Sequence, residues 1–131
     1  MYRACIVTAD TQHSHLYLYD RSDETTGIAE HFVEVAKLAS THVEHAGGHV
    51  DKLITEFADH VATRIGEIAT AHSLATVIVC AGPRMLGQLR TAMHHLQPGT
   101  TVTEVAHELT KLSPHDLRAR LGEDGVLPPQ R

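Results

Sequence analysis

The sequence predicts an α/β fold: a five-stranded mixed sheet flanked by helices. Three strand-like segments joined by short polar links open the chain, which indicates an antiparallel meander. Amphipathic helices then alternate with two further strand-like runs, which indicates two parallel crossovers. The composition, 42% hydrophobic and 21% charged with only 4% aromatic, is that of a globular domain with an aliphatic core. A length of 131 residues predicts one domain, residues 1–121, and a loose tail, residues 122–131.

The first half of the predicted sheet is antiparallel. Arg3–Ala9 is an apolar, β-branched run, and His15–Asp20 alternates apolar and polar residues, so the short polar link between them predicts a hairpin. Residues 21–27 are all polar or glycine and predict a loop. His31–Ala39 fits neither period cleanly, and its β-branched content favours a third strand.

The second half of the predicted sheet is parallel and buried. Apolar residues recur every three or four positions over residues 50–72, which predicts a long amphipathic helix. Residues 74–81 are apolar except for Thr76 and show no alternation, the pattern of a strand covered on both faces. We expect this fourth strand to lie beside the first, with Cys5 and Cys80 near one another in the core.

The remaining elements have clear start signals. Gly82-Pro83 begins a second helix that ends before Pro98-Gly99, and residues 100–106 form a fifth strand. Ser113 followed by Pro114 predicts an N-capped helix through Leu121. Beyond it, the tail has too little apolar content to pack.

Cysteine usage and hydropathy favour a cytoplasmic protein. Cys5 and Cys80 both lie in apolar strand-like runs, so they are expected to be reduced, buried thiols. The first residues lack the pattern of a secretory signal, and no apolar run approaches the roughly 20 residues of a membrane span, so no membrane partner is expected.

The strand and helix order is shared with ribonuclease H-like nucleases, in which carboxylates on the first and fourth strands hold two divalent ions. Asp10 ends the first strand, but the fourth ends Cys80-Ala81-Gly82-Pro83 without an acid. We therefore favour a structural role for Asp10, whose side chain bonds the backbone of its own turn. Cys80 precedes a helix, a position that can activate a thiol, but a buried apolar role is favoured there too.

Twelve histidines are unusually many for this length and raise the question of a metal site. His42, His45 and His49 are spaced by three and four, which would align them on one helix face as zinc ligands. Gly47-Gly48 interrupts such a helix, so surface histidines and no cofactor are the favoured interpretation, with zinc as the alternative.

Anion and nucleic-acid binding depend on a few arginines. Gly82, Arg84 and Arg90 could hold an anion at the start of the second helix. Arg118 and Arg120 are the other cationic candidates, but they point to different sides of one helix. The net charge of −5, from 11 basic and 16 acidic residues, disfavours RNA binding. Residues 1–70 carry 5 basic and 11 acidic side chains (−6) and residues 71–131 carry 6 and 5 (+1), so any polyanion-binding surface should be C-terminal.

Two stretches resemble the bacterial host attachment protein family. Residues 75–90, ATVIVCAGPRMLGQLR, and residues 108–117, ELTKLSPHDL, look like the strand, helix start and late motif typical of its members. That family is similar to the middle domain of archaeal and eukaryotic class 1 peptide chain release factors, which carry a Gly-Gly-Gln loop before a long helix. Gly47-Gly48-His49 stands at the matching position, and histidine in place of glutamine implies that peptidyl-transfer RNA hydrolysis is absent.

The sequence therefore favours a non-enzymatic binding protein of the host attachment type. Its expected partner is a protein or the ribosome, which would give it a role in translation, and homo-oligomerisation stays open. The alternative is a metal-binding protein or metal-dependent hydrolase that uses His42, His45 and His49.

Overall fold

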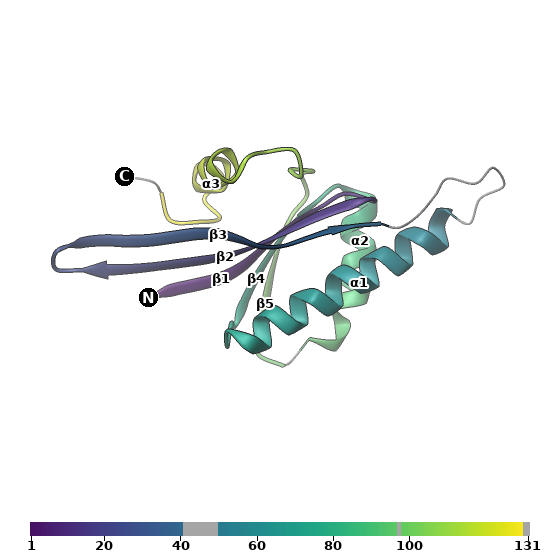
Figure 1. Ribbon diagram of the computed structural model, residues 1–131, viewed down its shortest axis with the longest axis horizontal. Coiled ribbons are helices and arrows are strands. Elements are labelled where there is room, and N and C mark those ends of the chain that lie inside the picture. Colours follow the sequence, from purple (N-terminus) through teal and green to yellow (C-terminus); the bar gives the residue numbers. More distant parts are fainter. Residues whose placement is uncertain (41–49, 97, 130–131) are drawn as a thin grey trace.

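A computed structural model describes residues 1–40, 50–96 and 98–129 of the chain (Figure 1). Its five strands form one sheet in the order β3-β2-β1-β4-β5. The strands are β1 (Tyr2–Ala9), β2 (His13–Glu24), β3 (Gly27–Ala39), β4 (Thr76–Ala81) and β5 (Thr101–Val105). The helices are α1 (Val50–Ala71), α2 (Pro83–Ala92), a short 3₁₀ turn (Met93–His95) and α3 (Pro114–Glu123).

The sheet is mixed, as the sequence predicts. β1 and β2 are antiparallel, as are β2 and β3, whereas β1 with β4 and β4 with β5 are parallel. Each parallel crossover carries a helix, because parallel neighbours require a long connection. The predicted neighbourhood of the first and fourth strands is confirmed.

The prediction of a loop over residues 21–27 is wrong except at Thr25 and Thr26, which form the turn. β2 continues to Glu24 and pairs with β3 up to the Glu24–Gly27 pair, while β1 begins only opposite Arg21. The hairpin therefore projects beyond the rest of the sheet as an arm (Figure 1). Backbone pairing needs no apolar side chains, so a strand that leaves the core loses the apolar alternation by which strands are recognised.

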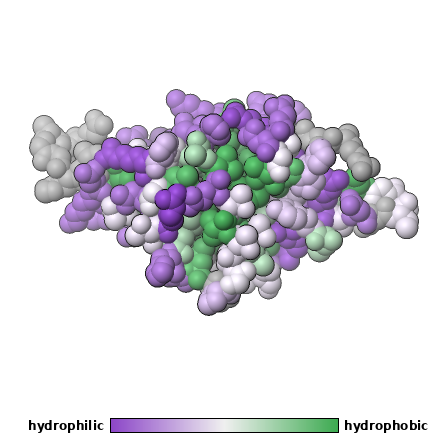
Figure 2. All heavy atoms as spheres, turned by 180° about the vertical axis from the view of Figure 1, so that it is seen from behind, coloured by the Kyte–Doolittle hydropathy of each residue, from purple (hydrophilic) through white to green (hydrophobic). Residues whose placement is uncertain are grey.

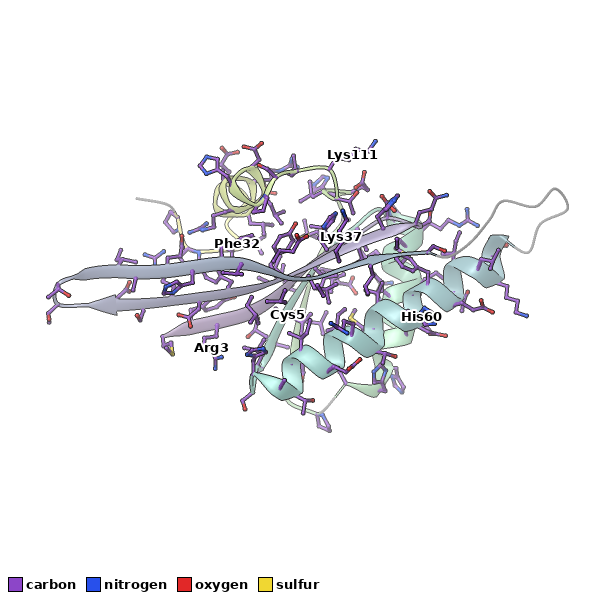
Figure 3. The ribbon with its side chains drawn as sticks, in the orientation of Figure 1. Arg3, Cys5, Phe32, Lys37, His60 and Lys111 are labelled. Atoms are coloured by element: carbon purple, nitrogen blue, oxygen red, sulfur yellow. The ribbon has the colours of Figure 1, made fainter. Side chains whose placement is uncertain are left out.

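Helices cover both faces of the sheet. α1 and α2 pack on one face, over a core that contains Val7, Leu16 and Val79, and α3 packs on the other, over Ile6, Tyr17 and Ile78. Figure 3 shows the alternation: Arg3 and Cys5 lie on the α1 side, and Phe32 and Lys37 on the α3 side. Seen from behind, hydrophobic atoms form a band across the middle of the molecule (Figure 2). Among the described helices, none has the length and hydropathy to cross a membrane.

The two cysteines are buried and free, as predicted, but they are not neighbours. In the β1–β4 register Cys5 pairs with Val77 and Cys80 with Thr8. Cys5 faces α1, whereas Cys80 belongs to the core under α3. The expectation that they meet in one core is wrong, because an offset of three residues along a strand changes the face.

The described part of the tail packs, contrary to expectation. α3 extends to Glu123, and Leu127 is buried in the same core as Tyr19. The amides of Val126 and Leu127 donate to the carbonyl of Leu121 at 2.9 and 3.1 Å, which folds the chain back at the helix end. Leu127 and the hydrogen bonds that Arg118 and Arg21 donate to the carbonyls of Pro128 and Pro129 hold the segment.

Candidate functional site

The carboxyl end of β1 carries the acid singled out in the sequence. Asp10 Oδ1 accepts hydrogen bonds from the amides of Gln12 and His13 at 2.7 and 2.6 Å. This is the predicted turn role, and it is confirmed. Burial works to raise the pKa of Asp10, but these amides and the Thr110 hydroxyl outweigh it and hold the pKa below its usual value. The carboxylate is ionised at neutral pH.

A second carboxylate reaches the same place from a distant part of the chain. Thr110 Oγ1 donates to Asp10 Oδ2 at 3.0 Å and also contacts Glu108, whose Oε1 accepts the Thr110 amide at 2.7 Å. Glu108 also lies next to the end of β4, because a Cβ placed on Gly82 would be 4.0 Å from Glu108 Cβ. Glu108 therefore brings a carboxylate to the place where β4 itself ends without one. Sequence reasoning missed it because 98 residues separate it from Asp10. Its local signal was the Glu-x-Thr spacing of a polar turn.

The arrangement at this end does not complete a metal site within the described residues. No group of three or more His, Cys, Asp or Glu side chains there could hold an ion together. His13 Nδ1 lies 3.5 Å from Asp10 Oδ1, and His15 Nδ1 lies 2.5 Å from Glu34 Oε1 in a separate pair across the β2–β3 hairpin. His42, His45 and His49, and with them the Gly47-Gly48-His49 loop, lie outside the described residues.

Each arginine proposed as a cationic contact has a carboxylate partner. Arg84 pairs with Asp51, and Arg90 binds both oxygens of Glu104 at 2.8 and 2.6 Å. The Arg90 guanidinium lowers the pKa of Glu104. Gly82 is the N-cap of α2, and the neighbouring Arg84 guanidinium is already paired with Asp51 of α1. These pairs leave little unbalanced positive charge for an anion.

The arginines of α3 point to different sides of the helix, as the sequence predicts, but Arg118 is buried rather than part of a solvated surface. Arg118 is buried against Tyr19 and Glu30, whereas Arg120 is half-exposed and pairs with Asp124 at 3.0 Å. α2 and α3 lie on opposite faces of the sheet, so the four arginines do not share one surface (Figure 1).

The Cys80 thiol is unsuited to nucleophilic chemistry. Burial raises its pKa to about 12, with a further rise from Asp124, and the pKa of Cys5 is raised to about 12 by burial alone. Because the thiolate is the reactive form, both sulfurs are inert at neutral pH.

The outer strand of the sheet presents three exposed apolar side chains, interspersed with the charged residues Glu30, Glu34 and Lys37. β3 is an edge strand, and Val33 is 54% exposed, Ile28 40% and Val35 38%. Val33 lies opposite Leu18, on the α1 side, where α1 packs on β1 and β4 and leaves the valine uncovered. Val35 is the extra residue of a bulge, since Leu16 pairs with Ala36 and Tyr17 with Glu34.

A groove of about 1000 Å³ lies at the opposite end of the sheet from Asp10. The C-terminal half of α1 forms one wall, and the turn after α2 with the segment before β5 forms the other. Hydroxyl groups, Glu67 and His95 line it together with Leu74 and Leu96. Sequence reasoning assigned nothing here, because the two walls come from residues 63–75 and from residues 95, 96 and 98–100, with β4 and α2 between them in the sequence.

Comparisons with known proteins identify the family. A search of the curated proteins finds no relative of this chain. The resemblance to release-factor middle domains stays a prediction. Residues 38–121, well over half of the chain and including α1, β4, α2, β5 and most of α3, match a family described as "Protein required for attachment to host cells". The chain therefore belongs to the host attachment protein family.

Proposed function

We propose that this chain is a non-enzymatic binding protein that contacts a partner polypeptide along the outer edge of β3. One observation carries the proposal: a 13-residue edge strand, Gly27–Ala39, with exposed Val33 and Val35 and no described strand on its outer side. Unpaired backbone groups on such an edge recruit further strands. Addition of a partner strand would satisfy those groups, and its apolar side chains would cover Val33. β3 carries the charged residues Glu30, Glu34 and Lys37 and a bulge at Val35, so it should accept a strand of complementary charge rather than pair indiscriminately.

Other features are in keeping with a binding role. The described acidic pair at Asp10 is held by hydrogen bonds within the chain, and both thiols are buried. Membership of the host attachment family is likewise compatible with an activity exerted through contact.

The experiment compares one substitution on each edge of the sheet. Val33→Glu places a charge on β3, and the matched control Thr101→Glu places one on β5, where Thr101 is also exposed. Proteins captured from an extract are identified by mass spectrometry, and one retained by the wild type and the control is purified. We expect Val33→Glu to weaken its binding at least tenfold, since an interfacial carboxylate would be desolvated without a partner.

Hydrogen exchange of the purified complex locates the contact. Strand addition should slow exchange of β3 amides and leave β5 amides unchanged. If Val33→Glu retains every captured protein as well as Thr101→Glu does, β3 is not the binding edge.

The finer form of the proposal is a ribosomal partner and a cytoplasmic, translation-associated role, which derives from the release-factor resemblance. Sedimentation with ribosomes over a salt series tests it. Phosphate-mediated binding would be strongest at low salt, so absence of co-migration there rejects the ribosomal partner.

A further inference from the structure

The groove between α1 and the segment before β5 has the electrostatics of a cation site. We propose that it binds an arginine or lysine side chain of an extended polypeptide. This inference is independent of the β3 proposal, because the groove and Val33 are built from different elements.

The end of α1 makes the groove electronegative. The helix dipole places partial negative charge at the C-terminus of this 22-residue helix, and its last turn contains no basic residue. The carbonyls of Ile68, Ala69 and Thr70 accept hydrogen bonds from the amides of residues 72–74, so the dipole adds to the field of Glu67 and these three carbonyls are not free acceptors. Glu67, one turn before that end, lines the groove. Within its described lining there is no lysine or arginine, so the carboxylate faces the groove without a cationic neighbour in that lining.

His95 adds a hydrogen-bond acceptor. Its Nδ1 lies 2.7 Å from the carbonyl oxygen of Ala92, which can only accept, so Nδ1 carries the proton. In the neutral ring Nε2 is then an acceptor. It lies 3.6 Å from the position of a Cβ on Gly66, on the groove wall formed by α1.

The remaining lining fits the stem and backbone of a peptide. Thr63, Thr70, Ser73 and Thr100 provide hydroxyls, while Leu74 and Leu96 provide apolar surface for methylene groups. About 1000 Å³ exceeds the volume of a single ammonium ion and accommodates a side chain with its neighbouring backbone.

The probe is a set of acetylated, amidated pentapeptides, Gly-Gly-X-Gly-Gly, in which X is arginine, lysine or the uncharged arginine analogue citrulline. They are titrated into the ¹⁵N-labelled full chain at low ionic strength. We expect the arginine or lysine peptide to shift the amides of Gly66, Ser73, Gly99 and Thr100, and the citrulline peptide to shift them much less. Spermidine separates a free polyamine from a peptide, and preferential binding of spermidine overturns the proposal.

Two variants and a control test the role of charge. Glu67→Gln should weaken binding by up to about fivefold, the range of an exposed charge pair, and exposed Thr70→Lys should abolish it by filling the groove with a cation. The control Glu56→Gln removes a carboxylate from the same helix outside the groove and should change nothing. Equal effects of the two glutamine variants, or equal shifts with citrulline, overturn the proposal. Val33→Glu should leave this binding intact.

Discussion

The buried guanidinium of Arg118 should contribute more to stability than any other charged group described on α3. Arg118 is only 4% exposed and donates to Glu30 Oε1 from Nε and Nη2, at 3.1 and 2.8 Å. Nη2 also donates to the Pro128 carbonyl at 2.6 Å, and the guanidinium carbon lies 5.4 Å from the Tyr19 ring centre. It therefore fastens α3 and the tail to the β2–β3 hairpin.

The substitution Arg118→Met keeps the apolar stem and removes the charge. Loss of a buried ion-pair partner costs about 3–5 kcal/mol when the other charge is left without solvent. Glu30 is 28% exposed and retains the Tyr19 hydroxyl as a donor, and Arg118 Nη1 has no hydrogen-bond partner among the described residues. We therefore expect a smaller loss, about 2 kcal/mol, in the free energy of unfolding, which corresponds to roughly 8 °C in Tm for a domain of this size.

Urea unfolding and calorimetry measure the effect, with Arg120→Met as the matched control. Arg120 is on the same helix, but its pair with Asp124 is half-exposed, so its removal should cost about 0.5 kcal/mol or less. If Arg118→Met is no more destabilising than Arg120→Met, the buried pair does not hold α3 to the hairpin, and the reasoning fails.

Three further predictions concern the pH dependence of stability, the reactivity of the cysteines and zinc binding. Arg118 holds the pKa of Glu30 below its usual value, against the effect of burial. The stabilisation from Glu30 is therefore present above its unfolded pKa of about 4.3 and is lost as the pH falls below that value. In Arg118→Met the free energy of unfolding should fall less steeply with decreasing pH in this range, and an unchanged pH dependence would contradict the reasoning. Neither Cys5 nor Cys80 should react with a thiol reagent at neutral pH in the folded chain, and both should react in urea; a fast phase in native protein would show an accessible sulfur. If His42, His45 and His49 bind zinc, calorimetric titration of untagged protein should show binding of one zinc ion per chain. His45→Ala should abolish this binding, and the control His115→Ala should keep it. Absence of stoichiometric binding in the wild type rejects the zinc hypothesis.

The elements that sequence predicts best are those whose own residues are buried. α1 has a continuous apolar stripe, and β4 is apolar and buried from Val77 to Ala81, so both appear at close to their expected bounds. The β2–β3 arm escaped prediction because its described side chains at residues 22, 23 and 25–27 are half-buried or exposed and need not be apolar. The packing of Leu127 escaped because a single residue carries no periodicity.

Site geometry is harder to predict, because it depends on contacts between distant segments. The opposite facing of Cys5 and Cys80 follows from the β1–β4 register, which apolar patterns on two fully buried strands do not specify. The groove beside Glu67 requires the crossing of α1 with the segment before β5, and neither segment carries a motif. The β3 edge could be inferred once three sequential strands were assigned, but the exposure of Val33 depends on how far α1 extends over it.

Asp10 shows why an acid at the end of the first strand need not carry the chemistry that other proteins with this strand order place there. Its Oδ1 accepts two amides of its own turn, and its Oδ2 accepts the Thr110 hydroxyl, so both oxygens are occupied by donors that hold the β1–β2 link and the β5–α3 connection together. A divalent ion bound there would have to displace or share those donors. Glu108 approaches the same hydroxyl, which has only one hydrogen to donate, so the two carboxylates compete for it. Asp10 already has its backbone donors, and this end of the sheet is therefore better described as a structural junction between three segments than as a catalytic centre.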